Sequence, residues 1–183
     1  MGILIRHAPP LVEGLCAGRA DFAVQPTPES AERALEALTA ASLRPSGVVS
    51  SPSRRCHELA RELARRLELP LALDARLCEL DFGEWEGRAW DEIASTDRER
   101  YERWMACWRN EAPPGGESIP ALERRVGAWL NDEVSVSRVA VTHAGVIRAV
   151  RVLREGVTWE AAFSESVPYL TPWAFVSASQ APG

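Results

Sequence analysis

Two hydrophobic patterns alternate along the chain. Short continuous apolar runs are typical of buried strands, whereas apolar residues that recur every three or four positions are typical of helices packed on a core. Runs of the first kind predict strands at 2–6, 47–50, 71–73, 139–141 and 173–177. Strands that alternate with helices build a largely parallel sheet with helices on both faces. We therefore expect a three-layer α/β/α sandwich with a mainly parallel central sheet.

The second pattern, together with the residues at which it begins, predicts the helices. Thr27-Pro28 and Ser51-Pro52 each join a capping residue to a proline, a combination typical of a helix start. We expect these two helices to have Thr27 and Ser51 as their caps. The further expected helices lie at about 90–108, 122–130 and 146–153.

Composition and charge indicate which general class of protein the chain belongs to. With 183 residues, of which 46% are hydrophobic and 26% charged, the chain can bury one substantial core, so we expect one domain over 1–183. A net charge of −5 counts against a nucleic-acid partner, because such surfaces usually carry a basic excess. The apolar run at 2–5 is shorter than a secretory signal, and no run reaches the roughly 18 residues that span a bilayer. We therefore expect a cytoplasmic protein without a membrane partner.

The four cysteines have no C-x-x-C spacing, so neither a metal site nor a disulfide framework is expected.

Histidine and arginine residues stand at the ends of the predicted strands. Arg6 and His7 end the first strand, Arg55 lies in the helix after the second, and His143 follows the strand at 139–141. Carboxyl ends of parallel strands meet at one edge of a sheet, where helix N-termini also attract anions. Histidine acts near neutral pH as nucleophile, acid or base, and arginine grips phosphate with paired hydrogen bonds. The cluster therefore indicates phosphoryl chemistry.

Five segments follow one another along the chain as recognisable motifs. They are Arg6-His7-Ala8, Ser51 to Arg55, Leu77 to Gly87, Gly116-Glu117-Ser118 and His143-Ala144-Gly145. Together they resemble the signature of the histidine phosphatases, also called the phosphoglycerate mutase-like superfamily. Alanine stands here where that family has glycine after each histidine. Within the family the chain is most similar to the α-ribazole phosphatase branch, because the stretch from Leu15 to Asp21 resembles a segment of that branch.

The resemblance implies roles for the strand-end residues. His7 is expected to be the nucleophile and to form a transient phosphohistidine. Arg6, Arg55 and His143 are expected to bind the non-bridging phosphate oxygens. His143 is expected to be catalytic as well, because it would hold charge in the transition state. No metal and no cofactor are expected, since these side chains supply the electrostatic stabilisation.

The reaction also needs a proton donor, because a phosphomonoester has a poor alkoxide leaving group. Glu79 is expected to protonate the leaving oxygen and later to activate water, with Asp81 as the alternative. The expected activity is metal-independent hydrolysis of a small phosphorylated metabolite, with α-ribazole 5'-phosphate as the leading candidate. A phosphoglycerate mutase-type phosphotransferase stays open. So does a catalytically weak phosphate-binding protein, which Ala8 and Ala144 make conceivable.

By the same resemblance, residues at about 84–118 form a cap-like insertion over the catalytic pocket. Trp85 in this segment and Arg19 in an early loop are candidate substrate contacts. Stacking on a nucleoside-like base suits tryptophan, and a phosphate or ribose suits arginine. The alternative for Trp85 is core packing, and the alternative for Arg19 is a loop ion pair with Asp21.

Overall fold

A computed structural model describes residues 2–132 and 137–175 and places five strands in one sheet. Their order across the sheet is β3 (Leu71–Leu73), β2 (Val48–Ser50), β4 (Val139–Thr142), β1 (Gly2–Arg6) and β5 (Pro172–Phe175). The strands from β3 to β1 run parallel to their neighbours, and β5 is antiparallel to β1. The mainly parallel sheet expected from the sequence is confirmed.

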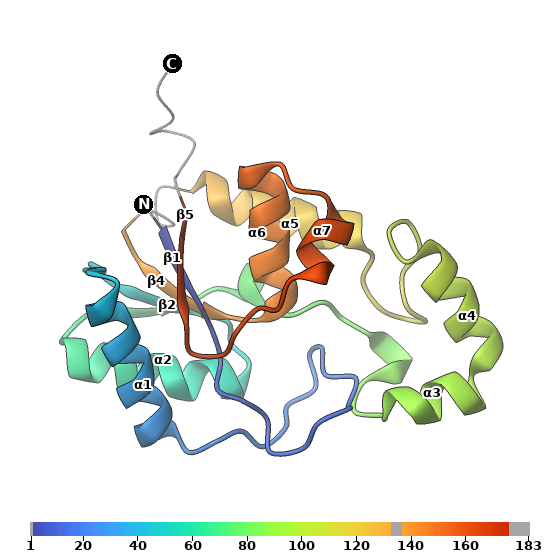
Figure 1. Cartoon of the computed structure of the whole chain (residues 1–183), viewed down its shortest axis with the longest axis horizontal. Coiled ribbons are helices and arrows are strands. Elements are labelled where there is room, and N and C mark those ends of the chain that lie inside the picture. The colour runs from blue at the N-terminus through green and yellow to red at the C-terminus, as the bar shows by residue number, and fades with distance from the viewer. Residues whose placement is uncertain (1, 133–136, 176–183) are drawn as a thin grey trace.

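Helices cover both faces of this sheet (Figure 1). They are α1 (Thr27–Ala40) and α2 (Arg54–Leu67) on one face, and α5 (Ile119–Asn131) and α6 (Ala144–Glu155) on the other. Successive side chains of β1 point to opposite faces, as in any strand. Ile3 and Ile5 pack in the core under α1 and α2, whereas Leu4 packs in the core under α5 and α6. The three-layer arrangement is confirmed.

Two short helices, α3 (Trp90–Thr96) and α4 (Arg98–Cys107), lie beyond the end of the sheet (Figure 1). The loosely helical stretch expected over about 90–108 is present but divided, because Asp97 has a non-helical backbone at φ −128° and ψ 38°. The indole of Trp85 donates to the Asp97 carboxylate at 2.8 Å, and Arg100 pairs with it at 2.6 Å. The residue that interrupts the helix is therefore held by its side chain.

Two predicted helix caps are also wrong. Pro26 precedes α1, so Thr27 is the first helical residue rather than the cap. α2 begins only at Arg54, because the Ser51 hydroxyl bonds to a histidine of the candidate site and to a neighbouring serine instead of capping the helix. A capping signal in sequence does not reveal that a tertiary partner competes for the same hydroxyl.

The remaining differences concern short elements and element ends. Three short elements were not expected: η1 (Ala75–Leu77), η2 (Gly83–Trp85) and α7 (Trp159–Ser164). Each spans too few turns to show a hydrophobic period. The second strand begins at Val48 rather than at 47, and β5 begins at Pro172, one residue early. Residues 176–177 of the expected last strand lie outside the described residues.

Candidate active site

Three parallel strands end at one edge of the sheet and deliver the candidate residues there. Arg6 at the end of β1 lies beside Thr142 at the end of β4, and β2 ends on the other side of β4. His7 and His143 come directly after the last residues of β1 and β4. Their rings meet edge to face with centroids 5.3 Å apart. The structure thus brings together the two histidines that the sequence places far apart.

A cavity of about 440 Å³ lies at this edge. We call it the phosphate cavity. His7 forms part of its wall, and the charged and phenolic side chains that line it with His7 are Arg6, Glu13, Glu79, Arg148 and Tyr169. Three of the residues predicted from sequence therefore face one space.

His7 is buried and electrically neutral. Its side chain is 4% exposed, and its Nδ1 lies 2.7 Å from the carbonyl oxygen of Ala8. A carbonyl only accepts, so Nδ1 carries the proton and Nε2 carries the free lone pair. Burial, and then the charges of Arg55 and Arg6, lower the pKa of His7 to about 3, although the Ala8 hydrogen bond raises it. A neutral imidazole with a free Nε2 is the form that a nucleophile requires.

Protein groups hold both terminal nitrogens of Arg6, whereas its Nε is left without a protein partner among the described residues. One terminal nitrogen donates to the Val167 carbonyl at 2.8 Å, and the other donates to the Tyr169 hydroxyl at 2.7 Å. The guanidinium also lies 3.6 Å from the centre of the Tyr169 ring. Its Nε is buried and has no partner among the described residues. A buried donor without a partner is costly, so this atom is suited to an anionic oxygen.

Arg55 and His143 lie behind the phosphate cavity and do not line it. Arg55 is 2% exposed and donates to the carbonyls of Gly18 and Ala20, and it also contacts Nδ1 of His143 at 3.1 Å. That nitrogen must accept, so Nε2 of His143 donates to the Ser51 hydroxyl at 2.9 Å. Burial, followed by the charge of Arg55, lowers the pKa of His143 well below its ordinary value. The expectation that both residues bind phosphate stays a prediction. The buried Nε of Arg55, which has no partner among the described residues, is a donor available for it.

Glu79 is the carboxylate of the phosphate cavity that the sequence singled out. Its two oxygens accept backbone N–H groups, from Leu80 at 2.9 Å and from Gly145 at 3.0 Å. A Cβ at Gly145 would meet the carboxylate of Glu79, so glycine at this position allows the carboxylate to approach the backbone of α6. Arg125 holds the backbone at this point, because its guanidinium donates to the carbonyls of Arg76, Cys78 and Glu79.

Arg125 is in turn fixed by Glu117, the central residue of the Gly-Glu-Ser motif. The two side chains form paired hydrogen bonds of 2.7 Å, and both are largely buried. All the donors of Arg125 are thereby used. Sequence reasoning noticed Glu117 but missed Arg125, which acts on carbonyl groups that no residue type signals.

The structure places three further candidates, Asp81, Arg19 and Trp85, outside the lining of the phosphate cavity. Asp81, the alternative acid, does not line the phosphate cavity: it accepts the Gly83 N–H at 2.8 Å and pairs with Arg19 at 3.4 Å. The loop ion pair of Arg19 is therefore made with Asp81, and Asp21 pairs with Arg55 instead. Trp85 is 0% exposed, so it is a core residue rather than a substrate contact. Arg19 lies outside the phosphate cavity as well, and its substrate role stays a prediction.

Glu86 fixes the loop that forms one wall of the phosphate cavity. Its carboxylate accepts the backbone N–H groups of Gly18, Arg19, Ala20 and Phe82 at 2.8 to 3.1 Å. A Cβ at Gly18 would clash with the backbone carbonyl of Leu80, so glycine is required there. The Phe-Gly-x-Trp-Glu-Gly segment thus contributes to the architecture of the site through Glu86.

Ala8 and Ala144, which replace glycines of the family pattern, fit the backbone without strain. Neither has a positive φ, the region in which glycine alone is comfortable. Ala8 is 2% exposed and packs in the core under α1 and α2. Ala144 is the first residue of α6, which begins earlier than the expected 146, and it lines the phosphate cavity.

Sequence reasoning gave no role in the site to Arg148 or Tyr169, which both line the phosphate cavity. Arg148 lies one helical turn after Ala144 on α6, so helical spacing from the late motif is a signal that points to it. Tyr169, which holds Arg6, lies in an irregular segment before β5 and carries no such signal.

Acidification is expected to destabilise the fold between about pH 6.5 and pH 3. Folded His7 binds its proton only near its lowered pKa of about 3, whereas unfolded His7 binds it near 6.5. The unfolded state therefore holds more protons in this window, so the free energy of unfolding falls as the pH falls, by up to about 1.4 kcal/mol per pH unit. Urea unfolding from pH 7.5 to 4 is expected to give a shallower dependence for His7→Gln. Equal slopes would contradict the lowered pKa of His7.

Comparison with known proteins agrees with this fold and indicates a family. Residues 3–171 match the model of the histidine phosphatase superfamily (branch 1). The α-ribazole phosphatase of Shigella flexneri superposes with a TM-score of 0.80 at 25% identity, over 93% of this chain and 87% of that one. The adenosylcobalamin/α-ribazole phosphatase of Salmonella typhimurium is 31% identical over 104 residues, which are 55% of this chain and 52% of that protein. A bifunctional protein of Mycobacterium tuberculosis is 43% identical over 81 residues, 44% of this chain and 22% of that protein.

This chain belongs to the histidine phosphatase superfamily, as its motifs predicted. Its alignments span about half of the Salmonella enzyme and under a quarter of the mycobacterial protein. Within the described residues, no three potential metal ligands of the His, Cys, Asp or Glu type gather into a cluster. The same part of the chain has no helix with the length and apolar character needed to cross a bilayer.

Proposed function

We propose that this chain hydrolyses small phosphomonoesters through a phosphohistidine. The observation that carries the proposal is the state of His7, which is neutral, has its Nδ1 proton bound to a carbonyl and keeps Nε2 free. It shares the phosphate cavity with the unpaired Nε of Arg6 and the carboxyl group of Glu79. Membership of the histidine phosphatase superfamily supports the same class of reaction.

The reaction has two steps. In the first, Nε2 of His7 bonds to phosphorus while the phosphorus–oxygen bond to the leaving group breaks, and Glu79 gives its proton to the leaving oxygen. In the second, a water oxygen bonds to phosphorus and the phosphorus–nitrogen bond breaks. Glu79 takes a proton from that water, and inorganic phosphate is released. The products are an alcohol and phosphate, and Glu79 returns to its starting state.

The arginines stabilise the negative charge of the transition state. Arg6 donates a hydrogen bond from Nε to a non-bridging oxygen, and its positive charge stabilises the negative charge that spreads over the transferred phosphoryl group. Arg55 and His143 complete the set by turning toward the phosphate. For Arg55 this means exchanging its bonds to the carbonyls of Gly18 and Ala20 for bonds to an anion, which is a stronger acceptor.

As substrate we propose α-ribazole 5'-phosphate. Relatives named as α-ribazole phosphatases come from the sequence comparison and from the structure comparison. Residues 84–118, which include α3 and α4, serve in this proposal as the cap that distinguishes substrates.

Phosphate release from α-ribazole 5'-phosphate, 3-phosphoglycerate and phosphoserine tests this proposal, with and without EDTA. We expect the largest kcat/KM for α-ribazole 5'-phosphate and no effect of EDTA. Conversion of 3-phosphoglycerate to 2-phosphoglycerate without free phosphate would identify a mutase. Phosphate binding without turnover of any ester would identify a phosphate-binding protein, and loss of activity in EDTA would refute the metal-independent mechanism.

A further inference from the structure

We infer that a second cavity, beside the phosphate cavity, binds a planar apolar ring carried by the substrate's leaving group. This inference rests on the proposed function and names the chemical class of the substrate. The second cavity has a volume of about 400 Å³ and lies between α4 and α7. We call it the aromatic cavity. None of the described residues that line it is charged, and most are aromatic.

The two cavities adjoin each other on two sides. Phe82 and Trp90 line both, and their rings meet edge to face with centroids 5.4 Å apart. On the other side, the guanidinium of Arg148, in the phosphate cavity, lies 4.9 Å from the ring centre of Phe163, in the aromatic cavity. A leaving group attached to a phosphate at His7 therefore has the aromatic cavity next to it.

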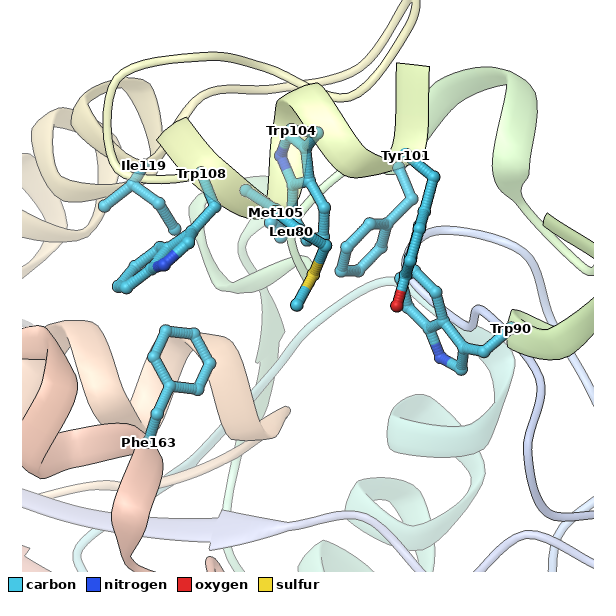
Figure 2. A pocket seen from close by; sticks show the side chains of 9 residues that line it. Leu80, Trp90, Tyr101, Trp104, Met105, Trp108, Ile119 and Phe163 are labelled. Carbon is cyan, nitrogen blue, oxygen red and sulfur yellow. The ribbon is translucent and has the colours of Figure 1, made fainter. Parts of the chain in front are cut away.

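Apolar side chains are left exposed around the aromatic cavity. Figure 2 shows Met105 of α4 and Phe163 of α7 reaching into the same space from opposite sides. They are 50% and 47% exposed, and apolar side chains that are exposed together around one cavity form the kind of patch that marks a binding site. A ligand ring between them would remove both surfaces from water, and this gain is proportional to the apolar area covered.

The walls of the aromatic cavity favour a flat ring. Trp90 and Trp104 are stacked with an interplanar angle of 12°, and Trp108 and Phe163 meet at 90° with centroids 5.0 Å apart. Flat faces and ring edges are both presented, so a bound ring can stack or pack edge to face. A volume of about 400 Å³ suits a ring system of drug-like size. A sugar or carboxylate group finds no charged partner among the described lining residues.

The test compares 3-phenylpropyl phosphate with propyl phosphate, because the two esters have similar alkoxide leaving groups and differ in the distal ring. We expect kcat/KM to be about 10- to 100-fold higher for the phenyl ester. Phe163→Ser and Met105→Ser should each lower this ratio at least several-fold. Leu73→Ser, at a residue that is 52% exposed on β3 and lines neither cavity, is the matched control and should leave the ratio unchanged.

Equal kcat/KM values for the two esters, or a ratio unaffected by both cavity variants, would overturn the inference. Calorimetric binding of the matching phosphonates, which cannot be hydrolysed, separates this outcome from failure of the proposed function. If neither ester is hydrolysed but 3-phenylpropyl phosphonate binds at least tenfold more tightly than propyl phosphonate, the ring-binding role of the aromatic cavity is supported and the proposed activity is refuted. Equal affinities for the two phosphonates would refute the ring-binding role whether or not the enzyme is active.

Discussion

Replacing His7 with alanine is expected to lower the rate of phosphomonoester hydrolysis by roughly 10⁴-fold or more, a loss typical of removing a catalytic nucleophile. The reason is the position of Nε2, which is the free lone pair of a neutral imidazole in the wall of the phosphate cavity. Alanine has no atom that can bond to phosphorus. p-Nitrophenyl phosphate is the substrate of choice, because its good leaving group needs no proton donor and isolates the nucleophilic step.

The same variant should no longer form the covalent phosphoenzyme. Rapid quenching of the wild type in alkali should trap an acid-labile phosphohistidine, and His7→Ala should trap none. His57→Ala is the matched control, because His57 is the remaining histidine of the chain, lies on α2 and does not line the phosphate cavity. Undiminished hydrolysis by His7→Ala, or loss of the phosphoenzyme in His57→Ala, would show that another residue is the nucleophile.

The parts of the site that sequence reveals most directly are those placed by the ends of the strands. Arg6 ends β1, and His7 and His143 come directly after β1 and β4, whose apolar runs are unambiguous; parallel strands end at a common edge. The meeting of these residues therefore follows from topology. The alternation of Ile3, Leu4 and Ile5 likewise determines which helix layer each side chain meets.

The parts that sequence does not reveal depend on side chains that bond to distant backbone. Arg125 holds three carbonyl groups that lie 46 to 49 residues away, and Glu86 holds N–H groups of a loop 66 to 68 residues away. A carbonyl or an N–H group has no residue identity, so no pattern of residue types predicts such a contact. Asp97 divides the expected long helix for a similar reason, since its partner Trp85 lies 12 residues away outside that helix.

A motif also does not show which of its side chains are buried in the core and which face a cavity. Trp85 and Trp90 belong to the same segment, yet Trp85 is fully buried and Trp90 lines both cavities. Phe163 reaches the aromatic cavity from α7, a helix too short to be recognised from its hydrophobic pattern. The substrate contacts that we propose are therefore drawn from two segments 58 residues apart, Met105 in one and Phe163 in the other.

Glu79→Gln is expected to lower kcat for an alkyl phosphomonoester by about 10²- to 10⁴-fold, the usual contribution of general acid catalysis. An alkoxide leaves poorly unless it is protonated, and glutamine has no acidic proton to give. The amide retains the size of the carboxyl group and one acceptor oxygen, so the contact with the Gly145 N–H can persist. The phosphate cavity should therefore keep its shape while its proton donor is lost.

The dependence on the leaving group distinguishes this role from a structural one. With p-nitrophenyl phosphate, Glu79→Gln should lose much less in the first, phosphohistidine-forming step, measured as the burst of p-nitrophenol, because that leaving group departs without a proton. Asp81→Asn is the matched control: Asp81 lies outside the phosphate cavity and pairs with Arg19, so both substrates should react at nearly the wild-type rate. If Asp81→Asn instead showed the larger loss with the alkyl ester, the acid would be Asp81. Equal losses of Glu79→Gln on both substrates would mean that Glu79 shapes the site without donating the proton.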